Sequence, residues 1–401
     1  MANLKGTIIS LGAGENQVPF LEAAVESGYQ IIGIDRKSNS PGFSLCRFKI
    51  IESVTEYRKI YSQISRLSLD EPLTAVGCRS YGKAIESQSY LAEKFSLPGN
   101  PLSVIKRFYD KAKMKKYLQQ NDIRVPKQYD INSIISKRLK LKVSDFPLIY
   151  KPTDGASKKG IKLIFKTDEL KKLIKKNSNA FLEEYIEGPE FTVLGFIYNG
   201  KAIIISISDK ITTEYPPFLE IAHILPGSYP DLSGEIKLIV QRIISLTGLS
   251  MGPFVAEFKA NKFGELYLME IMPEVGGEYL AESLIPEYYK YNYFMDYIRL
   301  INGSEPLCKK KENKKDKYSI IRFFVPPEGQ HYFKKFEVYP QEKKIKIFFE
   351  KNLLTPDSIV DTTSGNRARV KVIGYKSADF NYKEIQPQKV ENMEAIFEKY
   401  E

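Results

Sequence analysis

Two carboxylates stand in neighbouring apolar segments of this sequence. Glu257 lies in PFVAEFKA and Glu270 lies in ELYLMEIMP, and both segments have the composition of buried strands. A carboxylate inside an apolar strand needs a partner, because burying an unpaired charge is costly. The chemistry open to two such carboxylates is to hold a cation between them.

The four residues between the two segments, 261–264, predict a hairpin turn. Counted back from this turn, Glu257 would face Leu268, and Glu270 would stand two residues farther along the same face. The two carboxylates would then be diagonal neighbours, with Cα atoms about 7–8 Å apart. We interpret them as a Mg²⁺ site that carries phosphate oxygens. The alternative is that the two carboxylates lie on a solvent-exposed face of the sheet. The apolar residues beside them in both strands argue against this alternative.

A loop rich in glycine and lysine, KPTDGASKKG, follows another apolar run. Lys151 ends that run, and Gly155 and Gly160 can bring backbone N–H groups close to phosphate oxygens. The loop is not a P-loop, because neither glycine is followed by Lys and then Ser or Thr. The alternative is a plain hairpin tip with a surface lysine.

The cysteine and histidine content limits the kind of metal site. Cys46, Cys78 and Cys308 are far apart, which argues against disulfides and against a thiolate zinc site. His223 and His331 are the only histidines. A metal would therefore be held by carboxylates, which favours Mg²⁺ over zinc.

The 401 residues carry a formal charge of +11. Most lysines lie in helical patterns or in CKKKENKKDK, and such runs are more often solvated faces than binding sites. Because no basic stretch is interleaved with stacking aromatics, we expect no nucleic-acid partner. No apolar run is long enough for a membrane helix, and the start of the chain has the pattern of strand and turn rather than of a signal peptide, so we expect a cytoplasmic protein.

The first hundred residues predict a parallel sheet. Strand-like runs at residues 7–12 and 29–35 flank a helical run at 18–28, and a later strand and helix follow at 73–78 and 82–95. The glycines of the first βα turn match a dinucleotide fingerprint only in part, so we interpret them as a tight turn.

The rest of the chain predicts helices at 104–121 and 234–248, a hairpin around the loop after Lys151, and a second hairpin at Asn199-Gly200. The proline- and glycine-containing segment LPGNP at 97–101 and the lysine-rich stretch at 308–317 suggest domain boundaries. Beyond the second boundary we expect a small β-rich domain closed by a helix at 392–400.

Several separated motifs, in order, resemble the ATP-grasp superfamily. They are FPLIYK, DGASKKG, FLEEYIEGPEFTV and the pair AEFK…LMEIMP, preceded by LPGN…YDKAKMKKYL. The resemblance covers about residues 5–305 and is closest to the carboxylate–amine (amino acid and dipeptide) ligases. It implies an α/β protein with a pre-ATP-grasp domain at 1–100, an ATP-grasp domain at 101–305 and a C-terminal lid at 306–401, with ATP and Mg²⁺ as cofactors.

The resemblance also implies roles for individual residues. Glu257 and Glu270 would ligate Mg²⁺. Contacts to the nucleotide would come from Lys111, Lys151, Gly155, Ser157, Gly160, Glu183, Glu184, Ile186 and Glu190. Contacts to substrate would come from Glu220, His223, Gly276 and Gly277. Lys151, His223 and Glu274 are the candidates for direct participation in catalysis, and no general base is evident.

One departure from the family pattern concerns the residues after Glu270. The family usually has Asn and then Arg where this chain has Met272 and Glu274. The change removes a metal ligand and a donor to the carboxylate or acyl phosphate. Glu274 could instead hold a substrate's ammonium group, or it could mark a weakened metal site.

The function that the resemblance implies is ATP-dependent joining of a carboxylate to an amine through an acyl phosphate, with release of ADP and phosphate. The expected partners are small-molecule carboxylate and amine substrates, one of them an amino acid, and a second copy of the chain. Two alternatives stay open: a ligase for another carboxylate, and a regulatory nucleotide-binding protein without turnover.

Overall fold

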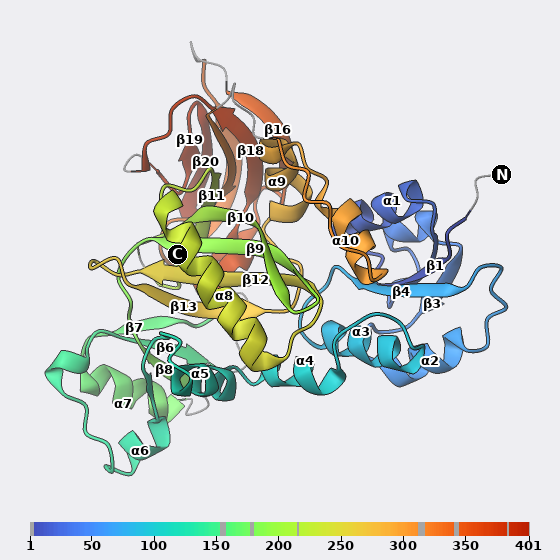
Figure 1. Ribbon diagram of the computed structural model, residues 1–401. Helices are drawn as coiled ribbons and strands as arrows, with labels where there is room; N and C mark the ends of the chain where they lie inside the picture. The colour runs from blue at the N-terminus through green and yellow to red at the C-terminus, as the bar shows by residue number, and fades with distance from the viewer. Residues whose placement is uncertain are drawn as a thin grey trace.

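A computed structural model describes residues 4–152, 158–176, 180–214, 216–311, 317–340, 345–382 and 385–400 of the chain (Figure 1). Gly155 and Ser157, two of the expected nucleotide contacts, lie outside these residues. Among the helices in these ranges, none is long and apolar enough to cross a membrane.

The N-terminal part is the expected parallel sheet, in strand order β3-β2-β1-β4. It contains one strand and one helix that the sequence patterns did not indicate, β3 and α2, both of them short. The elements are β1 (Thr7–Leu11), α1 (Val18–Glu26), β2 (Gln30–Asp35), β3 (Phe48–Ile51), α2 (Tyr57–Ile64), β4 (Leu73–Cys78) and α3 (Lys83–Lys94). This domain lies at the right of Figure 1, beside α10 (Tyr293–Ile301).

The single helix expected at 104–121 is wrong, because the chain breaks at Asp110. Two helices form instead, α4 (Leu102–Tyr109) and α5 (Lys111–Gln120). The Asp110 side chain accepts a hydrogen bond from the Lys113 N–H at 3.1 Å and so caps the second helix. The break places Tyr109 and Lys111 at a corner beside the site described below.

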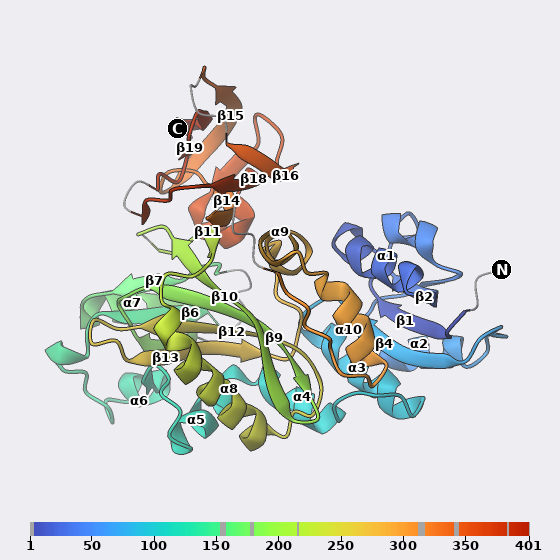
Figure 2. The same ribbon diagram turned by 45° about the horizontal axis from the view of Figure 1, so that its top comes forward.

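A small antiparallel lobe follows, with strand order β5-β8-β6-β7. It includes the hairpin expected after Lys151, and its helices cover one face, as Figures 1 and 2 show at the lower left. The elements are β5 (Gln128–Tyr129), α6 (Ile131–Ile135), β6 (Leu148–Pro152), β7 (Lys162–Ile164), α7 (Thr167–Lys176) and β8 (Ala180–Glu184).

The large central sheet has the order β13-β12-β9-β10-β11-β14-β18-β16. Its first hairpin turns at Asn199-Gly200, where φ values of 49° and 70° confirm the predicted type I′ turn. The elements are β9 (Glu190–Tyr198), β10 (Lys201–Thr212), β11 (Glu220–Leu225), α8 (Ser233–Thr247), β12 (Gly252–Ala260), β13 (Leu266–Met272), α9 (Ile285–Tyr289), β14 (Tyr318–Phe324), β16 (Lys346–Asn352) and β18 (Lys371–Ser377).

The C-terminal part extends this sheet and adds a second one. Strands β14, β18 and β16 continue from β11, so the region after residue 306 shares a sheet with the region before it. The second sheet has the order β17-β15-β20-β19 and is made of β15 (Gln330–Val338), β17 (Ile359–Asp361), β19 (Lys389–Val390) and β20 (Met393–Lys399). The helix expected at 392–400 is therefore wrong: this segment buries Met393 and Ala395 with a period of two and pairs with β15.

The hairpin of β12 and β13 differs from the expected register. Ala260 pairs with Leu266, and a β-bulge at Met269 then brings Glu257 directly opposite Glu270. The expected diagonal arrangement is wrong, because the turn shifts the pairing by one residue, from Glu265 to Leu266, and the bulge then inserts one more residue on β13. The two carboxylates are thus closer neighbours than the turn alone suggested.

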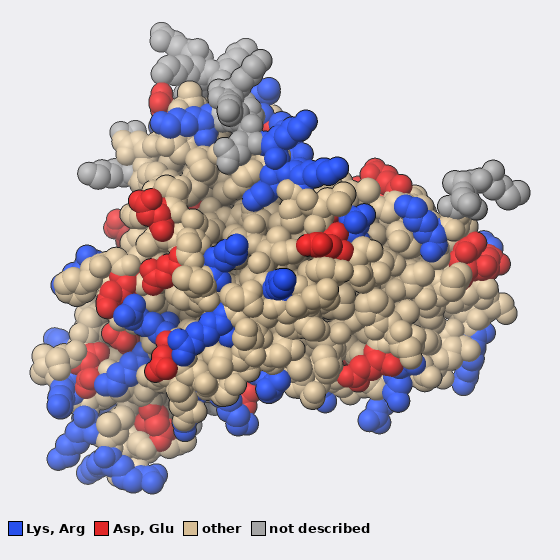
Figure 3. Space-filling model, viewed as in Figure 1, with Lys and Arg blue, Asp and Glu red and all other residues tan. Residues whose placement is uncertain are grey.

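Charge is interspersed on the surface. On the face shown in Figure 3, Lys and Arg lie among Asp and Glu over the lobe of β5–β8 at the lower left. Over this lobe, on the face shown, the lysines do not form one continuous basic surface.

Gly188, between β8 and β9, lies where no larger residue fits. Its φ is +141°, and a Cβ atom there would come within 1.9 Å of the Ala260 carbonyl oxygen. Gly188→Ala is expected to lower the free energy of unfolding by about 1–3 kcal/mol in a urea titration, because the end of β12 must move away. Gly234→Ala is the control: a Cβ there has nothing within 4 Å, and its effect should stay within about 0.5 kcal/mol. Equal effects of the two substitutions would contradict this account.

Candidate functional site

A cavity of about 550 Å³ lies between the small lobe and the central sheet. Its polar wall brings together lysines and carboxylates from segments that are far apart in sequence. The lysines are Lys111, Lys115, Lys151, Lys158 and Lys159, and the carboxylates are Glu183, Glu220, Glu257, Glu270, Glu274 and Glu278. Such a wall can bind an anion at one place and a cation at another.

Two lysines, Lys115 of α5 and Lys151 of the small lobe, share one carboxylate. Glu183 of β8 accepts from Lys115 at 2.5 Å and from Lys151 at 2.7 Å. Burial alone would raise the pKa of Glu183, but the two lysines outweigh it and lower the pKa to about 2. Burial, together with the nearby charge of Lys151, lowers the pKa of Lys115 to about 8. The lysines are held in place at the cavity wall, where they can meet phosphate oxygens.

Glu183→Gln is expected to remove a pH-dependent part of the stability. The folded pKa lies below the ordinary value of 4.5, so the carboxylate stabilises the fold above about pH 4.5, and this stabilisation is lost as the pH falls towards 2. A shift of this size corresponds to about 3 kcal/mol. Denaturant titrations between about pH 3 and pH 6 should show the free energies of unfolding of the wild type and the variant converging at low pH. Glu184→Gln, at a position without an ion pair among the described residues, is the control, and its effect should stay within about 0.5 kcal/mol.

The facing carboxylates of β12 and β13 are each paired with a lysine. Glu257 Oε1 lies 2.8 Å from Lys210 Nζ, and Glu270 Oε1 lies 2.6 Å from Lys111 Nζ. Burial would raise the pKa of Glu270, but Lys111 lowers it. The second oxygen of each carboxylate has no partner within the described part of the chain, and both side chains are about one-third exposed, at 35% and 37%. Two carboxylates with free oxygens on one wall fit a Mg²⁺ ion.

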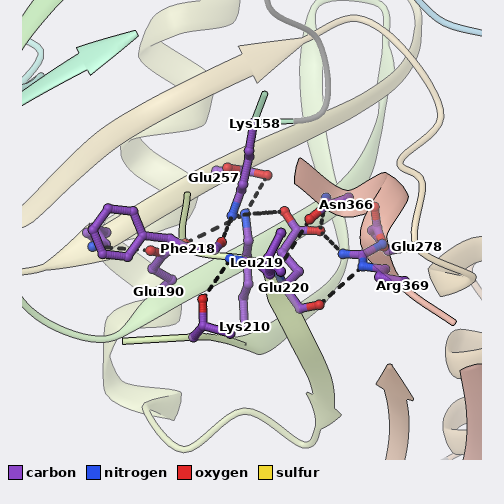
Figure 4. A network of polar contacts seen from close by, with 12 residues as sticks. Lys158, Glu190, Lys210, Phe218, Leu219, Glu220, Glu257, Glu278, Asn366 and Arg369 are labelled. Atoms are coloured by element: carbon purple, nitrogen blue, oxygen red, sulfur yellow. Dashed lines mark hydrogen bonds and ion pairs between the residues drawn. The ribbon is translucent and has the colours of Figure 1, made fainter. Parts of the chain in front are cut away.

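Lys210 is the centre of a buried network (Figure 4). Its side chain is 1% exposed, and its Nζ lies 2.8 Å from Glu257, 3.0 Å from Glu220 and 3.6 Å from Glu190. Glu190 also pairs with Lys259 at 3.1 Å. Burial opposes ionisation of Glu190, but the surrounding lysines lower its pKa to about 2. The network neutralises carboxylates that would otherwise repel one another.

The other side of Glu220 faces the C-terminal part of the chain. Arg369 donates to Glu220 Oε2 at 2.8 Å and also pairs with Glu278, and Asn366 donates to Glu220 at 3.1 Å. Lys158, from the loop after β6, lies 3.3 Å from Glu220 and donates to the Phe218 carbonyl at 2.8 Å. The small lobe, the central sheet and the C-terminal segment therefore all contact the carboxylate of Glu220.

His223 lies beside this network on β11. It is 1% exposed, and neither ring nitrogen has a hydrogen-bond partner among the described residues. Burial lowers its pKa to about 3. The His223 ring, Glu220 and Glu278 lie close enough together to hold a metal ion. The charges of both carboxylates are, however, already compensated by Arg369. We therefore regard His223 as a neutral residue behind the cavity wall.

Several expected contacts do not line the cavity. Glu184 accepts from the Lys127 N–H on the other face of β8, and the Ile186 carbonyl accepts from Lys259. Gly160 lies in the loop whose neighbours line the wall, and its N–H donates to the Thr363 carbonyl at 3.4 Å. Gly276 and Gly277 are also absent from the wall.

The sequence reasoning missed residues that complete the site. Lys115 stands four residues after Lys111, a spacing that places both on one helix face and that could have indicated it. Lys210 is a lysine inside an apolar strand, the same kind of signal that marked Glu270. The other missed residues are Lys158, Glu278, Asn366 and Arg369, and for Asn366 and Arg369 no local pattern points to the site.

The chain is similar to known proteins. Residues 144–282 match the family described as the ATP-grasp domain. A D-alanine–D-alanine ligase from Fusobacterium nucleatum is 29% identical over 216 residues, which cover 51% of this chain and 69% of that protein.

Two solved structures share the fold. An L-amino acid ligase from Bacillus licheniformis has a TM-score of 0.72 and 18% identity, covering 96% of this chain and 95% of that chain. The biotin carboxylase domain of a 2-oxoglutarate carboxylase from Hydrogenobacter thermophilus, solved in complex with MgADP, has a TM-score of 0.66 and 16% identity, covering 94% of this chain and 87% of that chain. Together these matches confirm the predicted ATP-grasp fold.

Proposed function

We propose that this chain, an ATP-grasp ligase by its domain and its relatives, joins a small carboxylate to an amine with release of ADP and phosphate. The observation that carries the proposal is the cavity wall on which Glu257 and Glu270 face each other beside Lys111, Lys115 and Lys151. Carboxylates with free oxygens and a group of fixed cations are what a bound metal–nucleotide complex requires.

The proposed chemistry is phosphoryl transfer to the substrate carboxylate. The carboxylate attacks the γ-phosphate, and the resulting acyl phosphate is captured by the amine. Bound Mg²⁺ would neutralise charge on the phosphate oxygens, and Glu257 and Glu270 would hold it. Lys111 and Lys151 would position the phosphates, since catalysis of phosphoryl transfer consists mainly of positioning and charge stabilisation.

An amino acid is the proposed class for one substrate. The relatives named above, a D-alanine–D-alanine ligase and an L-amino acid ligase, support this class. Glu220 lines the cavity and would contact the substrate, whereas His223 would act from behind it. We further propose that the chain forms a homodimer.

A regulatory protein without turnover is the second candidate. It is favoured by Met272, which lines the cavity where the family usually offers an oxygen ligand. The two candidates differ in whether a substrate stimulates ADP release.

The test is release of ADP and phosphate from Mg²⁺-ATP with pools of amino acids, other small carboxylates and amines. We expect one combination of pools to stimulate both products in equal amounts. Nucleotide binding measured in parallel by calorimetry identifies the other outcome: tight Mg²⁺-ATP binding with no stimulated release from any pool would favour the regulatory protein.

A further inference from the structure

Glu274 is a fixed part of the cavity wall. It follows β13, and its Oε2 accepts from the Gly82 N–H at 3.3 Å and from the Tyr109 hydroxyl at 3.5 Å. Gly82 precedes α3, and Tyr109 ends α4. Two elements outside its own strand therefore contact this carboxylate, while its Oε1 accepts no hydrogen bond from any described residue.

No salt bridge within the described residues compensates the charge of Glu274, although Lys111 acts on it from beyond salt-bridge distance and lowers its pKa. Within the described residues, each of the other carboxylates on the wall has a salt bridge to a lysine or arginine, and Glu274 has none. The compensated carboxylates are Glu183, Glu220, Glu257, Glu270 and Glu278. Consistent with this, burial raises the pKa of Glu274 to about 7, although the Gly82 N–H acts in the opposite direction.

Apolar side chains also line the cavity wall beside Glu274, together with the charged Lys111 and Glu270. Met269, Ile271 and Met272, from the strand that leads to Glu274, line the same cavity, and Phe108 does so from α4. A carboxylate at the edge of an apolar wall suits a ligand with a methylene chain that ends in a positive charge. Where the family usually places an arginine, which attracts an anion, this chain places a group that attracts a cation.

We propose that Glu274 binds a cationic nitrogen of a substrate, at a distance from the reacting carboxylate and amine. The substrate class that this implies is a basic amino acid or an aliphatic diamine. The inference rests on the proposed ligase function and specifies which substrates that site selects.

The test compares ligands of matched length that differ in one cationic nitrogen. L-lysine is paired with L-norleucine, and 1,5-diaminopentane with pentylamine. Binding is measured by calorimetry to the full chain with Mg²⁺ and a non-hydrolysable ATP analogue. We expect the wild type to bind the cationic member of at least one pair about 10-fold or more tightly than the neutral member, and Glu274→Gln to abolish that preference without changing the affinity for the nucleotide.

Two further variants serve as controls. Glu265→Gln changes a carboxylate that pairs with Arg124 outside the cavity, and it should leave the preference intact. Glu274→Arg should weaken binding of the cationic ligand below that of the neutral one. Thermal unfolding of each variant shows whether it is folded, and because Glu274→Gln and Glu274→Arg predict different affinities, either folded variant tests the proposal.

The outcomes separate this inference from the proposed function. Equal affinity of the wild type for both members of each pair, or binding of none of the four ligands, would overturn the role of Glu274. So would a Glu274→Gln variant that loses affinity for Mg²⁺ and nucleotide instead, since Glu274 would then be a metal ligand. If cation binding depends on Glu274 but no ligand stimulates ADP release, the role of Glu274 stands and the ligase proposal fails. If only neutral substrates stimulate ADP release, the ligase proposal stands and the role of Glu274 fails.

Discussion

Glu270→Gln is expected to lower kcat for substrate-stimulated ADP release by about 10³-fold, because a lost metal ligand removes several kcal/mol of transition-state stabilisation. Glutamine keeps the size of the side chain and can still accept from Lys111, which lies 2.6 Å from the carboxylate. The change therefore removes a charge rather than a packing contact. The measurement is steady-state release of ADP at saturating ATP over a range of Mg²⁺ concentrations.

The matched control for this substitution lies on the same hairpin. Glu265→Gln alters a residue at the turn that pairs with Arg124, and it should leave kcat within about twofold of the wild type. If Glu270→Gln also retained kcat within about threefold, with the same dependence on Mg²⁺, the assignment of Glu270 to the metal would be wrong.

Lys210→Met is expected to lower the free energy of unfolding by about 3–5 kcal/mol, since it leaves buried carboxylates without their cation. Lys210 lies within 3.0 Å of both Glu220 and Glu257 and is almost inaccessible to solvent. Methionine replaces the aliphatic stem, so the loss is mainly electrostatic. Urea titration at neutral pH in the absence of Mg²⁺ measures the effect.

Two comparisons make this prediction specific. Lys201→Met changes an exposed lysine on the same strand and should stay within about 0.5 kcal/mol of the wild type. The double variant Lys210→Met with Glu257→Gln should lose less than the sum of the single losses, because it removes one of the unpaired charges. Additive losses, or a loss below about 1 kcal/mol for Lys210→Met alone, would show that the network does not stabilise the fold.

Short-range patterns identified most of the fold but left some segments ambiguous. The parallel N-terminal sheet, the hairpins and the long helix α8 all have a clear period or a clear turn signal. Residues 392–400 have neither, and they form a strand only because β15 supplies a partner along their whole length. The break at Asp110 likewise depends on a capping bond that the helical pattern conceals.

For the site, the paired carboxylates could be predicted from the amino-acid sequence alone. A charged residue inside an apolar strand is unusual enough to be recognised from the sequence, so Glu257 and Glu270 were identified as a pair, and the Mg²⁺ ion between them stays a prediction. The order of motifs around them indicated the ATP-grasp fold, and with it the cofactors. These features depend on residues that are close together in the chain, or on the order of local patterns along it.

The tertiary structure alone decided how the charges are compensated. The bulge at Met269 set the register of Glu257 and Glu270, and the fold brought Lys210 and Arg369 to Glu220 from strands and loops far away in the chain. It also showed that Glu274 forms no salt bridge with a described residue, which its position in the sequence could not reveal. The physical reason is that the energy of a buried charge depends on every group within a few ångströms, and those groups are brought together only by packing.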